Sequence, residues 1–309
     1  MISIVIVNWN SGELLEKCVR SLQRHAEGCE IVIVDNASTD GSLRFVSGIE
    51  SDVTVLNNDE NLGFAAGCNV GWKAGKGAHI LFLNPDTECL PESIRCLEQT
   101  LLKDRSVWAV GGQLVSPSGL PQTSFNVRTF PTVGKVAAEM LFIDEIRAAV
   151  GRRRPKGRND SATAIDVDQP AAACLMVSGN ALEYVGGFDE GFYPAWFEDV
   201  DFCRRIRDHG GRILYQPGAR FLHHGGYSLH HMARQDFLEC FHRNQLRYFR
   251  KHHGSHVASR VKRLIVLGMF LRSVISTIYP LVPGNSRKSS ARIFLRAGKH
   301  IRDWREAEL

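Results

Sequence analysis

The chain has 309 residues, 44% of them hydrophobic and 23% charged, and a formal net charge of +5. This length and apolar content suffice for one large α/β domain, or one domain with an appendage, and they exclude an intrinsically disordered protein. Basic residues are unevenly distributed, because Lys, Arg and His are dense from Arg243 onward. This asymmetry suggests that the C-terminal part lies near an anionic surface, either a membrane or a nucleic acid.

The eight cysteines occur singly, without the C-x-x-C spacing that structural zinc sites use. We therefore expect reduced, mostly buried thiols and a cytoplasmic protein. The chain starts directly with the apolar run Ile2–Val7, with no basic stretch or cleavage site before it, so we do not expect secretion.

Short apolar runs that alternate with helical patterns predict a mainly parallel sheet with right-handed crossovers. Buried strands are expected at Ile2–Val7, Ile31–Val34, Val53–Leu56, Ile80–Leu83 and Val107–Val115. After the first strand, apolar residues recur at helical spacing from Leu14 to Leu22, and Asn10 and Glu13 have the spacing of a capping box.

The fourth strand ends abruptly at Asn84-Pro85-Asp86, because Pro cannot continue a ladder of hydrogen bonds. Open α/β sheets bind their ligands at the carboxyl ends of the strands. A carboxylate there suits Mg²⁺, which takes one or two protein carboxylates and completes its shell with phosphate oxygens and water. Asp86 is therefore our first candidate functional residue, and the alternative is a simple turn, which all three residues favour.

Polar clusters also follow the second and third strands. Asp35 could accept a hydrogen bond from a pyrimidine ring N–H and so select uracil or thymine, and a helix-capping turn through Ser38 or Asp40 is compatible with that role. Asn61 and Gly63 precede a helix whose N-terminus favours phosphate, and glycine there lets a ligand approach closely. The spacing is not G-x-G-x-x-G, so a dinucleotide oxidoreductase is not predicted.

The middle of the chain gives fewer signals, and Gln122–Thr132 has no clear periodicity. Gly151–Arg158 is a basic loop, which reads either as a solvated insertion or as a flap that grips a phosphate-bearing acceptor. The pattern resumes at Ala171–Val177, a strand of small residues that suits close packing under a binding site, and Gly186–Glu190 makes a turn.

A helix follows the aromatic pair Trp196-Phe197, and its first turn carries the acids Glu198, Asp199 and Asp201. The helix dipole is enough to explain Glu198, and Asp201 can pair with Arg205 one turn later. Asp199 is the best-placed candidate for a general base.

Two short strands, Ile213–Tyr215 and Ala219–Leu222, lead to His223 and His224. Successive strand residues point to opposite faces, so one imidazole could bind a metal while the other points elsewhere. A purely structural role for this pair is equally open.

Taken together in order, seven motifs resemble those of inverting family 2 glycosyltransferases, most closely the rhamnosyltransferase-like branch. They are Val7–Asn10, Val34–Ser42, Asn61–Ala65 with Asn69, Leu83–Asp86, Gly186–Glu190, Glu198–Asp201 and His223–Ser228. The resemblance implies a GT-A fold, in which a Rossmann-like, mainly parallel sheet is flanked by helices and binds a nucleoside diphosphate sugar.

The resemblance also implies a role for each matching residue. Asp35 would contact the pyrimidine, Asp86 would hold Mg²⁺ or Mn²⁺ against the diphosphate, Asp199 would be the base, and His223 or His224 would reach the metal or the diphosphate. The donor site would further include Asn8, Asn10, Asn61, Gly63 and Asn84, and the acceptor site or its surroundings would include Trp196, Glu198 and Asp201. Asn84 replaces the first Asp of the commoner D-x-D pattern, which puts more weight on the histidine as a ligand.

We expect residues 1–230 to form the GT-A catalytic domain, with a nucleotide-sugar half at 1–115 and an acceptor and catalytic half at 116–230. Residues 231–309 read as a basic amphipathic helical extension. Its apolar stretch Leu264–Pro283 contains Arg272, so it is expected to lie in a membrane interface rather than to span a bilayer. Alternatively it packs on the catalytic domain or on a second subunit, as in a homodimer.

The resemblance thus implies a metal-dependent, inverting glycosyltransferase acting in cell-surface polysaccharide synthesis, and with the basic tail we expect it to be peripheral on the inner face of the plasma membrane. It would move a sugar from dTDP-rhamnose or a UDP-sugar to a glycan or lipid-linked acceptor. One alternative is a nucleotidyltransferase, against which stands the lack of a Gly-rich loop with a basic residue near the N-terminus. Another is a non-catalytic nucleotide-sugar-binding or membrane scaffold protein. No nucleic-acid module is recognisable, so no nucleic-acid partner is expected.

Overall fold

The structure, a computed structural model, describes residues 1–309 except 49–52, 144–145, 147–162, 226–231, 279–286 and 305–309. Three parts of the predicted pattern therefore lie outside the described residues: the basic loop Gly151–Arg158, Gly226–Ser228 of the last motif, and the end of the apolar stretch Leu264–Pro283. The chain folds as two compact units. The first consists of Met1–Phe130 and Arg158–His231, and the second of Pro131–Gly157 and Met232–Leu309.

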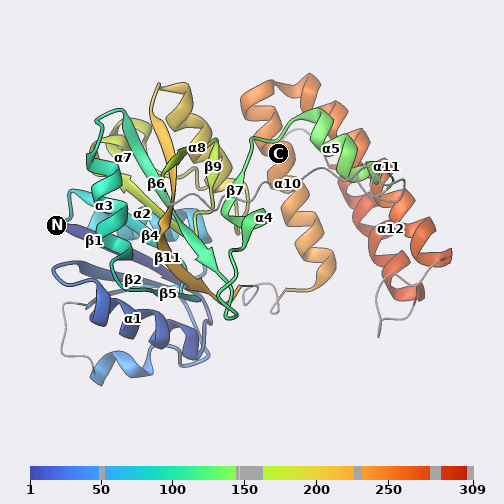
Figure 1. The fold of residues 1–309 in the computed structure, drawn as a ribbon. Coiled ribbons are helices and arrows are strands. Elements are labelled where there is room, and N and C mark those ends of the chain that lie inside the picture. The colour runs from blue at the N-terminus through green and yellow to red at the C-terminus, as the bar shows by residue number, and fades with distance from the viewer. Residues whose placement is uncertain (49–52, 144–145, 147–162, 226–231, 279–286, 305–309) are drawn as a thin grey trace. The chain divides into compact units, whose positions relative to one another are not determined.

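A mixed sheet forms the centre of the first unit (Figure 1). Its strand order is β3 (Val53–Asn58), β2 (Glu30–Asn36), β1 (Ile2–Asn8), β4 (His79–Leu83), β10 (Cys174–Ser178), β6 (Val107–Val115), β11 (Arg212–His223) and β5 (Thr87–Cys89), with β8 (Ile165–Asp166) paired to β11. The first four strands are parallel, β10 runs antiparallel to both of its neighbours, and β11 runs parallel to β6. The predicted, mainly parallel sheet flanked by helices is confirmed.

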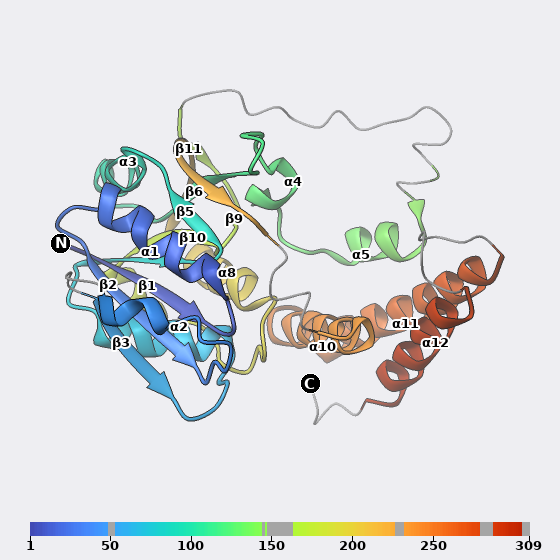
Figure 2. The same ribbon diagram turned by 90° about the horizontal axis from the view of Figure 1, so that it is seen from below.

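Helices cover both faces of this sheet, which is why its central strands are continuous apolar runs. On one face, α1 (Glu13–His25) and α3 (Ser93–Leu102) pack on the strands, and on the other lie α2 (Phe64–Ala74), α7 (Gly179–Val185) and α8 (Glu198–Asp208) (Figures 1 and 2). Between β2 and β3 the described chain forms a short 3₁₀ helix, η1 (Arg44–Gly48). A Cβ atom at Gly71 would lie 2.3 Å from Cγ1 of Val5, so glycine brings α2 close to the sheet.

The start of α1 differs from the prediction. The N-cap of α1 is Gly12, and no side chain caps the helix. Oδ1 of Asn10 instead accepts a hydrogen bond from the backbone N–H of Thr39 at 2.8 Å. The predicted capping box is therefore wrong, because Asn10 ties the loop after β1 to the loop after β2.

Two strand boundaries also differ. Asp35, expected just beyond a strand, is inside β2 and pairs in register with Asn8 of β1. The two short strands expected between residues 213 and 222 are one strand, β11. Its pairing with β6 shifts register between Gln216 and Arg220, and this irregularity accommodates Pro217 within the strand.

The second unit is helical and consists of α5 (Val133–Met140), α10 (Arg234–His253), α11 (Ser255–Ile278) and α12 (Arg287–Asp303) in its described part. Arg272 of α11 donates hydrogen bonds to the carbonyls of Glu139 and Met140 at 2.9 and 3.1 Å, and its guanidinium lies 4.5 Å from the ring centre of Phe142. The charge that interrupts the apolar stretch thus satisfies the C-terminal end of α5. Among the described helices, none combines the length and the apolar content that a membrane crossing requires.

Candidate active site

Asn8 and Asp35 face each other across the ends of β1 and β2. Nδ2 of Asn8 lies within hydrogen-bond distance of Oδ1 of Asp35 at 2.6 Å, Oγ of Ser38 at 3.1 Å and Oγ of Ser42 at 2.9 Å. The other oxygen of Asp35 accepts from the backbone N–H of Ser38 at 3.0 Å. The carboxylate is thus buried and fixed, and a pyrimidine N–H would use one of its remaining lone pairs.

Asn61 and Gly63 form the turn before α2. Oδ1 of Asn61 accepts from the backbone N–H of Gly63 at 2.9 Å, and Gly63 has φ +84°. A Cβ atom there would lie 2.9 Å from the carbonyl oxygen of Pro194, which also accepts from Phe64 N–H at 2.8 Å. Glycine at this position therefore lets the protein's own loop approach the turn closely.

Asp86 lies between β4 and β5, opposite the end of β11. Its side chain is buried, and Oδ1 has no hydrogen-bond partner among the described residues. Nε2 of His223 is 3.5 Å from this oxygen, which is longer than a hydrogen bond. Burial lowers the pKa of His223 below its ordinary value, although the Asp86 carboxylate opposes that shift.

The tautomer of His223 follows from its contacts with Gln122. The amide nitrogen of Gln122 donates to the backbone carbonyl of His223 at 2.9 Å, so the amide oxygen is the atom that faces Nδ1 at 2.8 Å. Nδ1 therefore carries the proton, and a neutral ring presents a lone pair on Nε2 to the bare oxygen of Asp86. Two facing acceptors repel each other unless a cation lies between them.

These two ligands fit a hard divalent cation. Within the described ranges, no group of three or more His, Cys, Asp or Glu side chains is arranged to hold a metal. Mg²⁺ and similar ions, however, bind nucleotide substrates through one or two protein carboxylates and the phosphate oxygens. The orphaned oxygen of Asp86 supplies the one carboxylate, and the lone pair of His223 would add a nitrogen ligand, with Gln122 orienting the ring from the other side.

His224 and Asn84 flank this pair and are engaged elsewhere. Nε2 of His224 lies 2.9 Å from Oε1 of Glu88, so this imidazole is turned to a different carboxylate. The backbone of Asn84 receives its hydrogen bond from Thr87 and donates to Ala173, which makes Asn84–Asp86 a turn as well as a candidate ligand site.

Asp199 lies at the start of α8 and is 7% exposed. Oδ2 accepts from Nη2 of Arg128 at 3.0 Å, and Oδ1 accepts from the backbone N–H of Val200 at 2.8 Å. Arg128 belongs to β7 (Val127–Arg128), which pairs with β9 (Gln169–Pro170). The helix is preceded by Trp196 and Phe197, both in the left-handed region with φ of 74° and 72°.

A row of touching side chains joins Asp86 to Asp199. The ring of His223 stacks on Phe125 of α4 (Thr123–Asn126), with centroids 5.2 Å apart and an interplanar angle of 13°. The guanidinium of Arg128 lies 5.5 Å from the centre of the same Phe125 ring. The two carboxylates that the sequence singles out are therefore linked through three side chains of one folded unit.

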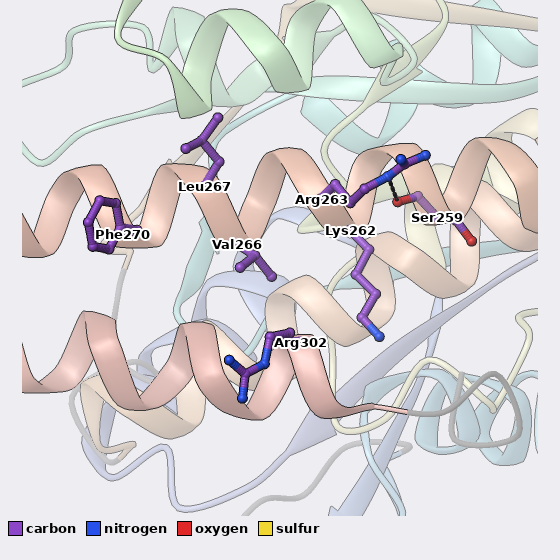
Figure 3. Close-up of a pocket in the computed structure, with 7 residues that line it drawn as sticks. All are labelled: Ser259, Lys262, Arg263, Val266, Leu267, Phe270 and Arg302. Carbon is purple, nitrogen blue, oxygen red and sulfur yellow. Dashed lines mark hydrogen bonds between the residues drawn. The ribbon is translucent and has the colours of Figure 1, made fainter.

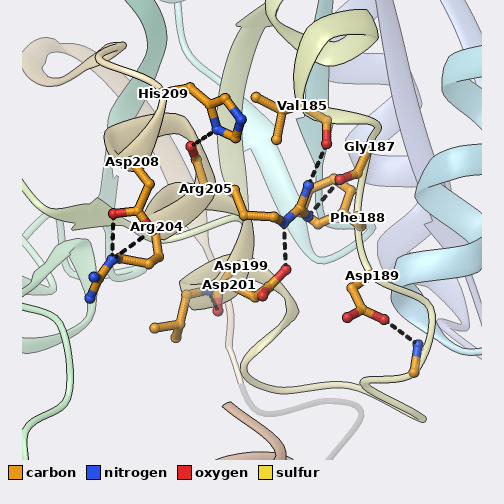
Figure 4. Close-up of polar contacts among 12 residues, drawn as sticks. Val185, Gly187, Phe188, Asp189, Asp199, Asp201, Arg204, Arg205, Asp208 and His209 are labelled. Carbon is orange, nitrogen blue, oxygen red and sulfur yellow. Dashed lines mark hydrogen bonds and ion pairs between the residues drawn. The ribbon is translucent and has the colours of Figure 1, made fainter. Parts of the chain in front are cut away.

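Asp201 serves the packing of α8 rather than an open surface (Figure 4). It is fully buried, and its Oδ2 accepts from Nε of Arg205 at 2.8 Å. The two other nitrogens of Arg205 donate to the carbonyls of Val185 and Gly187 at 2.8 and 2.7 Å. The pairing expected on helical spacing is present, and it fixes α8 to the turn after α7.

Glu198 is buried beside Asp199, and its Oε2 has no partner among the described residues. Burial, reinforced by the charge of Asp199, raises the pKa of Glu198 well above its usual range. Because unfolding then releases a proton above the ordinary pKa of a glutamate, this carboxyl destabilises the fold increasingly as pH rises.

The substitution Glu198→Gln is therefore expected to raise the free energy of unfolding at pH 7 by on the order of 1 kcal/mol. The gain should fade as pH falls below the ordinary glutamate pKa, where both states are protonated. Urea denaturation at pH 7 and pH 4 measures both values. A variant that is no more stable than the wild type at pH 7 would show that Glu198 is ionised and compensated.

Gln122, Phe125 and Arg128 are the site residues that sequence reasoning missed. They lie in the stretch without periodicity, where α4 and β7 are too short to give a pattern. One pattern in the sequence could have identified them. A Gln, an aromatic residue and an Arg follow one another at intervals of three residues in a segment that has no other regular pattern.

Comparison with known proteins identifies the domain. Residues 3–149 match the profile of Glycosyl transferase family 2. The chain carries a glycosyl transferase family 2 domain. Asn8, Asp35, Asp86 and Arg128 all lie inside the matched part, whereas Asp199 and His223 lie beyond it. The predicted resemblance is thus confirmed for the family.

Two relatives of the chain are named rhamnosyltransferases. The N-acetylglucosaminyl-diphospho-decaprenol L-rhamnosyltransferase of Mycobacterium tuberculosis is 26% identical over 248 residues, which cover 74% of this chain and 77% of that protein. The rhamnosyltransferase WbbL of Escherichia coli K12 is 24% identical over 251 residues, covering 78% and 88%. The likeness to the rhamnosyltransferase-like branch is confirmed.

Solved structures confirm the GT-A fold of the chain. The mannosyltransferase PcManGT from Pyrobaculum calidifontis, solved with GDP-Man and Mn²⁺, matches with a TM-score of 0.56 at 14% identity, over 98% of this chain and 87% of that one. GalNAc-T7, solved with UDP, GalNAc and Mn²⁺, matches with a TM-score of 0.62 at 15% identity. Here the match covers 96% of this chain but only 54% of the other.

Proposed function

We propose that this glycosyltransferase is inverting and moves a sugar from a nucleoside diphosphate sugar, of the dTDP-rhamnose or UDP-sugar type, to a glycan or lipid-linked acceptor in cell-surface polysaccharide synthesis. The observation that carries the proposal is the row of contacts from Asp86 through His223, Phe125 and Arg128 to Asp199. Two relatives named rhamnosyltransferases, one of them acting on a diphospho-decaprenol compound by its name, support a deoxysugar donor and a lipid-linked acceptor.

Asp199 is the base in this proposal. Its Oδ2 takes the proton of the acceptor hydroxyl while that oxygen attacks C1 of the sugar, and the bond from C1 to the diphosphate breaks on the opposite face. One displacement inverts the anomeric centre, so no second nucleophilic carboxylate is needed. Arg128 holds Oδ2 at 3.0 Å, so it gives up this contact when the hydroxyl arrives. The positive charge of the Arg128 guanidinium is then available to pair with the diphosphate.

Asp86 and His223 are the residues that would hold Mg²⁺ or Mn²⁺. A bound cation of this kind neutralises the charge that develops on a diphosphate leaving group. Around it we assign the donor to residues 1–115, with Asp35 against the pyrimidine and Asn8, Asn10, Asn61, Gly63 and Asn84 around the nucleotide. We assign the acceptor site to residues 116–230, with Trp196 and Glu198 near the acceptor hydroxyl. Asp201 supports α8 through its pair with Arg205.

Residues 231–309 provide a peripheral membrane contact in this proposal, which places the enzyme on the cytoplasmic face of the plasma membrane. A lipid-linked acceptor would be presented there. The basic helices α10, α11 and α12 support this assignment, because anionic lipids attract Lys and Arg.

Thermal-shift screening tests the donor. We expect dTDP and UDP, and their sugars, to raise the melting temperature by a few degrees in the presence of Mg²⁺ or Mn²⁺, and GDP to have a smaller effect. Mass spectrometry of reactions with dTDP-rhamnose and a diphosphopolyprenyl acceptor should then detect the transferred sugar. Preference for a triphosphate with release of pyrophosphate would instead indicate a nucleotidyltransferase. Tight binding without transfer or donor hydrolysis would indicate a non-catalytic binding protein.

A further inference from the structure

Helix α11 carries a row of large apolar side chains that its own unit does not cover in the described structure. Leu267, Phe270, Val274 and Ile278 are 45%, 54%, 40% and 60% exposed. Their spacing of three, four and four residues sets them along one side of the helix. The opposite side is buried, since Val261, Ile265 and Met269 have almost no exposed surface. A contiguous exposed apolar row of this kind marks an interaction surface.

A hollow of about 600 Å³ adjoins the N-terminal end of this row (Figure 3). It is lined by Ser259, Lys262, Arg263, Val266, Leu267, Phe270 and Arg302. The lining therefore combines three cations with apolar side chains. All three cations also have partners in the protein. Nζ of Lys262 donates to the carbonyl of Trp304 at 2.6 Å, Nε of Arg263 donates to the carbonyl of Ser259 at 3.4 Å, and Arg302 pairs with Asp303 at 2.9 Å.

The charge of the surrounding sequence narrows the choice of partner. From Cys240 to Arg302 the chain contains no Asp or Glu, while Lys and Arg recur throughout. A second copy of this face would meet like charge, which disfavours self-association through it. A nucleic acid would satisfy the cations but would leave the apolar row in contact with phosphates. An anionic lipid bilayer satisfies both, because headgroup phosphates take the cations and acyl chains take the apolar side chains.

We propose that the row Leu267, Phe270, Val274 and Ile278, together with the cations Lys262, Arg263 and Arg302, docks α11 in the interface of a bilayer that contains anionic phospholipid. The helix lies along the membrane plane, with its basic side chains reaching up to the headgroups. The proposed function includes a membrane contact, on which this inference rests. The surface identifies the residues that make that contact and the class of lipid that they bind. The docking itself needs neither donor nor acceptor.

Co-sedimentation of the full chain with vesicles tests the surface. We expect binding to vesicles of phosphatidylcholine mixed with phosphatidylglycerol, and little binding to phosphatidylcholine alone. The triple variant Lys262→Gln, Arg263→Gln, Arg302→Gln should bind the mixed vesicles about 100-fold more weakly, as expected for three basic residues at an anionic membrane surface. The double variant Leu267→Ser, Phe270→Ser should also weaken binding, and this loss should persist in high salt, where charge is screened.

A matched control removes the same charge from the first unit, through Lys73→Gln, Lys103→Gln and Arg105→Gln at exposed positions. It should bind like the wild type, and circular dichroism should show that all variants are folded. Equal losses of vesicle binding in both triple variants would show that binding depends on net charge alone, and this result would overturn the proposal. So would unimpaired binding of the double serine variant, or a change of the sedimentation coefficient from dimer to monomer in that variant.

Vesicle binding and sugar transfer, measured together, distinguish a failure of the docking surface from a failure of the proposed function. A chain that binds mixed vesicles but transfers no sugar would leave the docking surface standing and refute only the transferase mechanism. A chain that transfers sugar to a soluble acceptor but ignores both kinds of vesicle would do the reverse.

Discussion

The variant Asp199→Asn is expected to lose sugar transfer by at least about 100-fold, the usual contribution of a positioned general base, while it binds the nucleotide sugar as the wild type does. An amide has the shape of the carboxylate and can still accept from the N–H of Val200, but it cannot take a proton. Donor binding survives because Asp86, His223 and Asp35 are unchanged. Initial rates of product formation and calorimetric titration with the donor measure the two quantities.

Asp208→Asn is the matched control, since Asp208 ends the same helix at an exposed position, where it pairs with Arg204 one turn earlier. It should transfer sugar normally. If Asp199→Asn retains full transfer, Asp199 is not the base. If that variant loses donor binding in equal measure, the carboxylate shapes the site through Arg128 instead of moving a proton.

The variant Asp86→Asn is expected to weaken cation-dependent donor binding by at least about 10- to 100-fold, because a metal loses its carboxylate ligand. The fold should be retained. The new amide can donate to Nε2 of His223, which relieves the repulsion between two acceptors at 3.5 Å. Titration with dTDP or UDP, with and without Mn²⁺, measures the effect, and the melting temperature without ligand checks the fold.

Asp104→Asn is a suitable companion for this measurement, because Asp104 is an exposed aspartate that pairs with Arg212 far from the end of β4. Donor binding in that variant should depend on the cation as in the wild type. An Asp86→Asn variant whose donor affinity still rises fully with Mn²⁺ would contradict the assignment of Asp86 as a metal ligand.

Helices and strands whose conformation is set by the local sequence could be predicted. The strands β1, β2, β4 and β6 are buried on both faces, so their apolar runs are unbroken and their positions were clear. The helical character of residues 231–309 is another case, because the periodicity of a helix such as α10 is local. Where tertiary contacts decide, the prediction was wrong. Asn10 has the spacing of a cap, but the loop after β2 offers it a better partner in Thr39.

The candidate site shows the same division. Asp86 and Asp199 stand out because each is an acid at the end of a recognisable element. Arg128 does not, because its importance lies in a 3.0 Å contact with a residue far along the chain. Nor could the sequence tell His223 from His224, whereas the contacts with Gln122 and Glu88 separate their roles.

The left-handed backbone conformation of the two residues before α8 implies a conflict between thermal stability and activity. Neither Trp196 nor Phe197 favours its backbone conformation, and each costs about 1–3 kcal/mol that the surrounding contacts must offset. At Phe197 glycine would also remove a buried side chain, a loss of about 3–5 kcal/mol that outweighs the relief. Directed evolution toward heat resistance would therefore be drawn to Trp196→Gly, which would aim the neighbouring carboxylate less firmly, so selection for thermal stability alone would lower turnover.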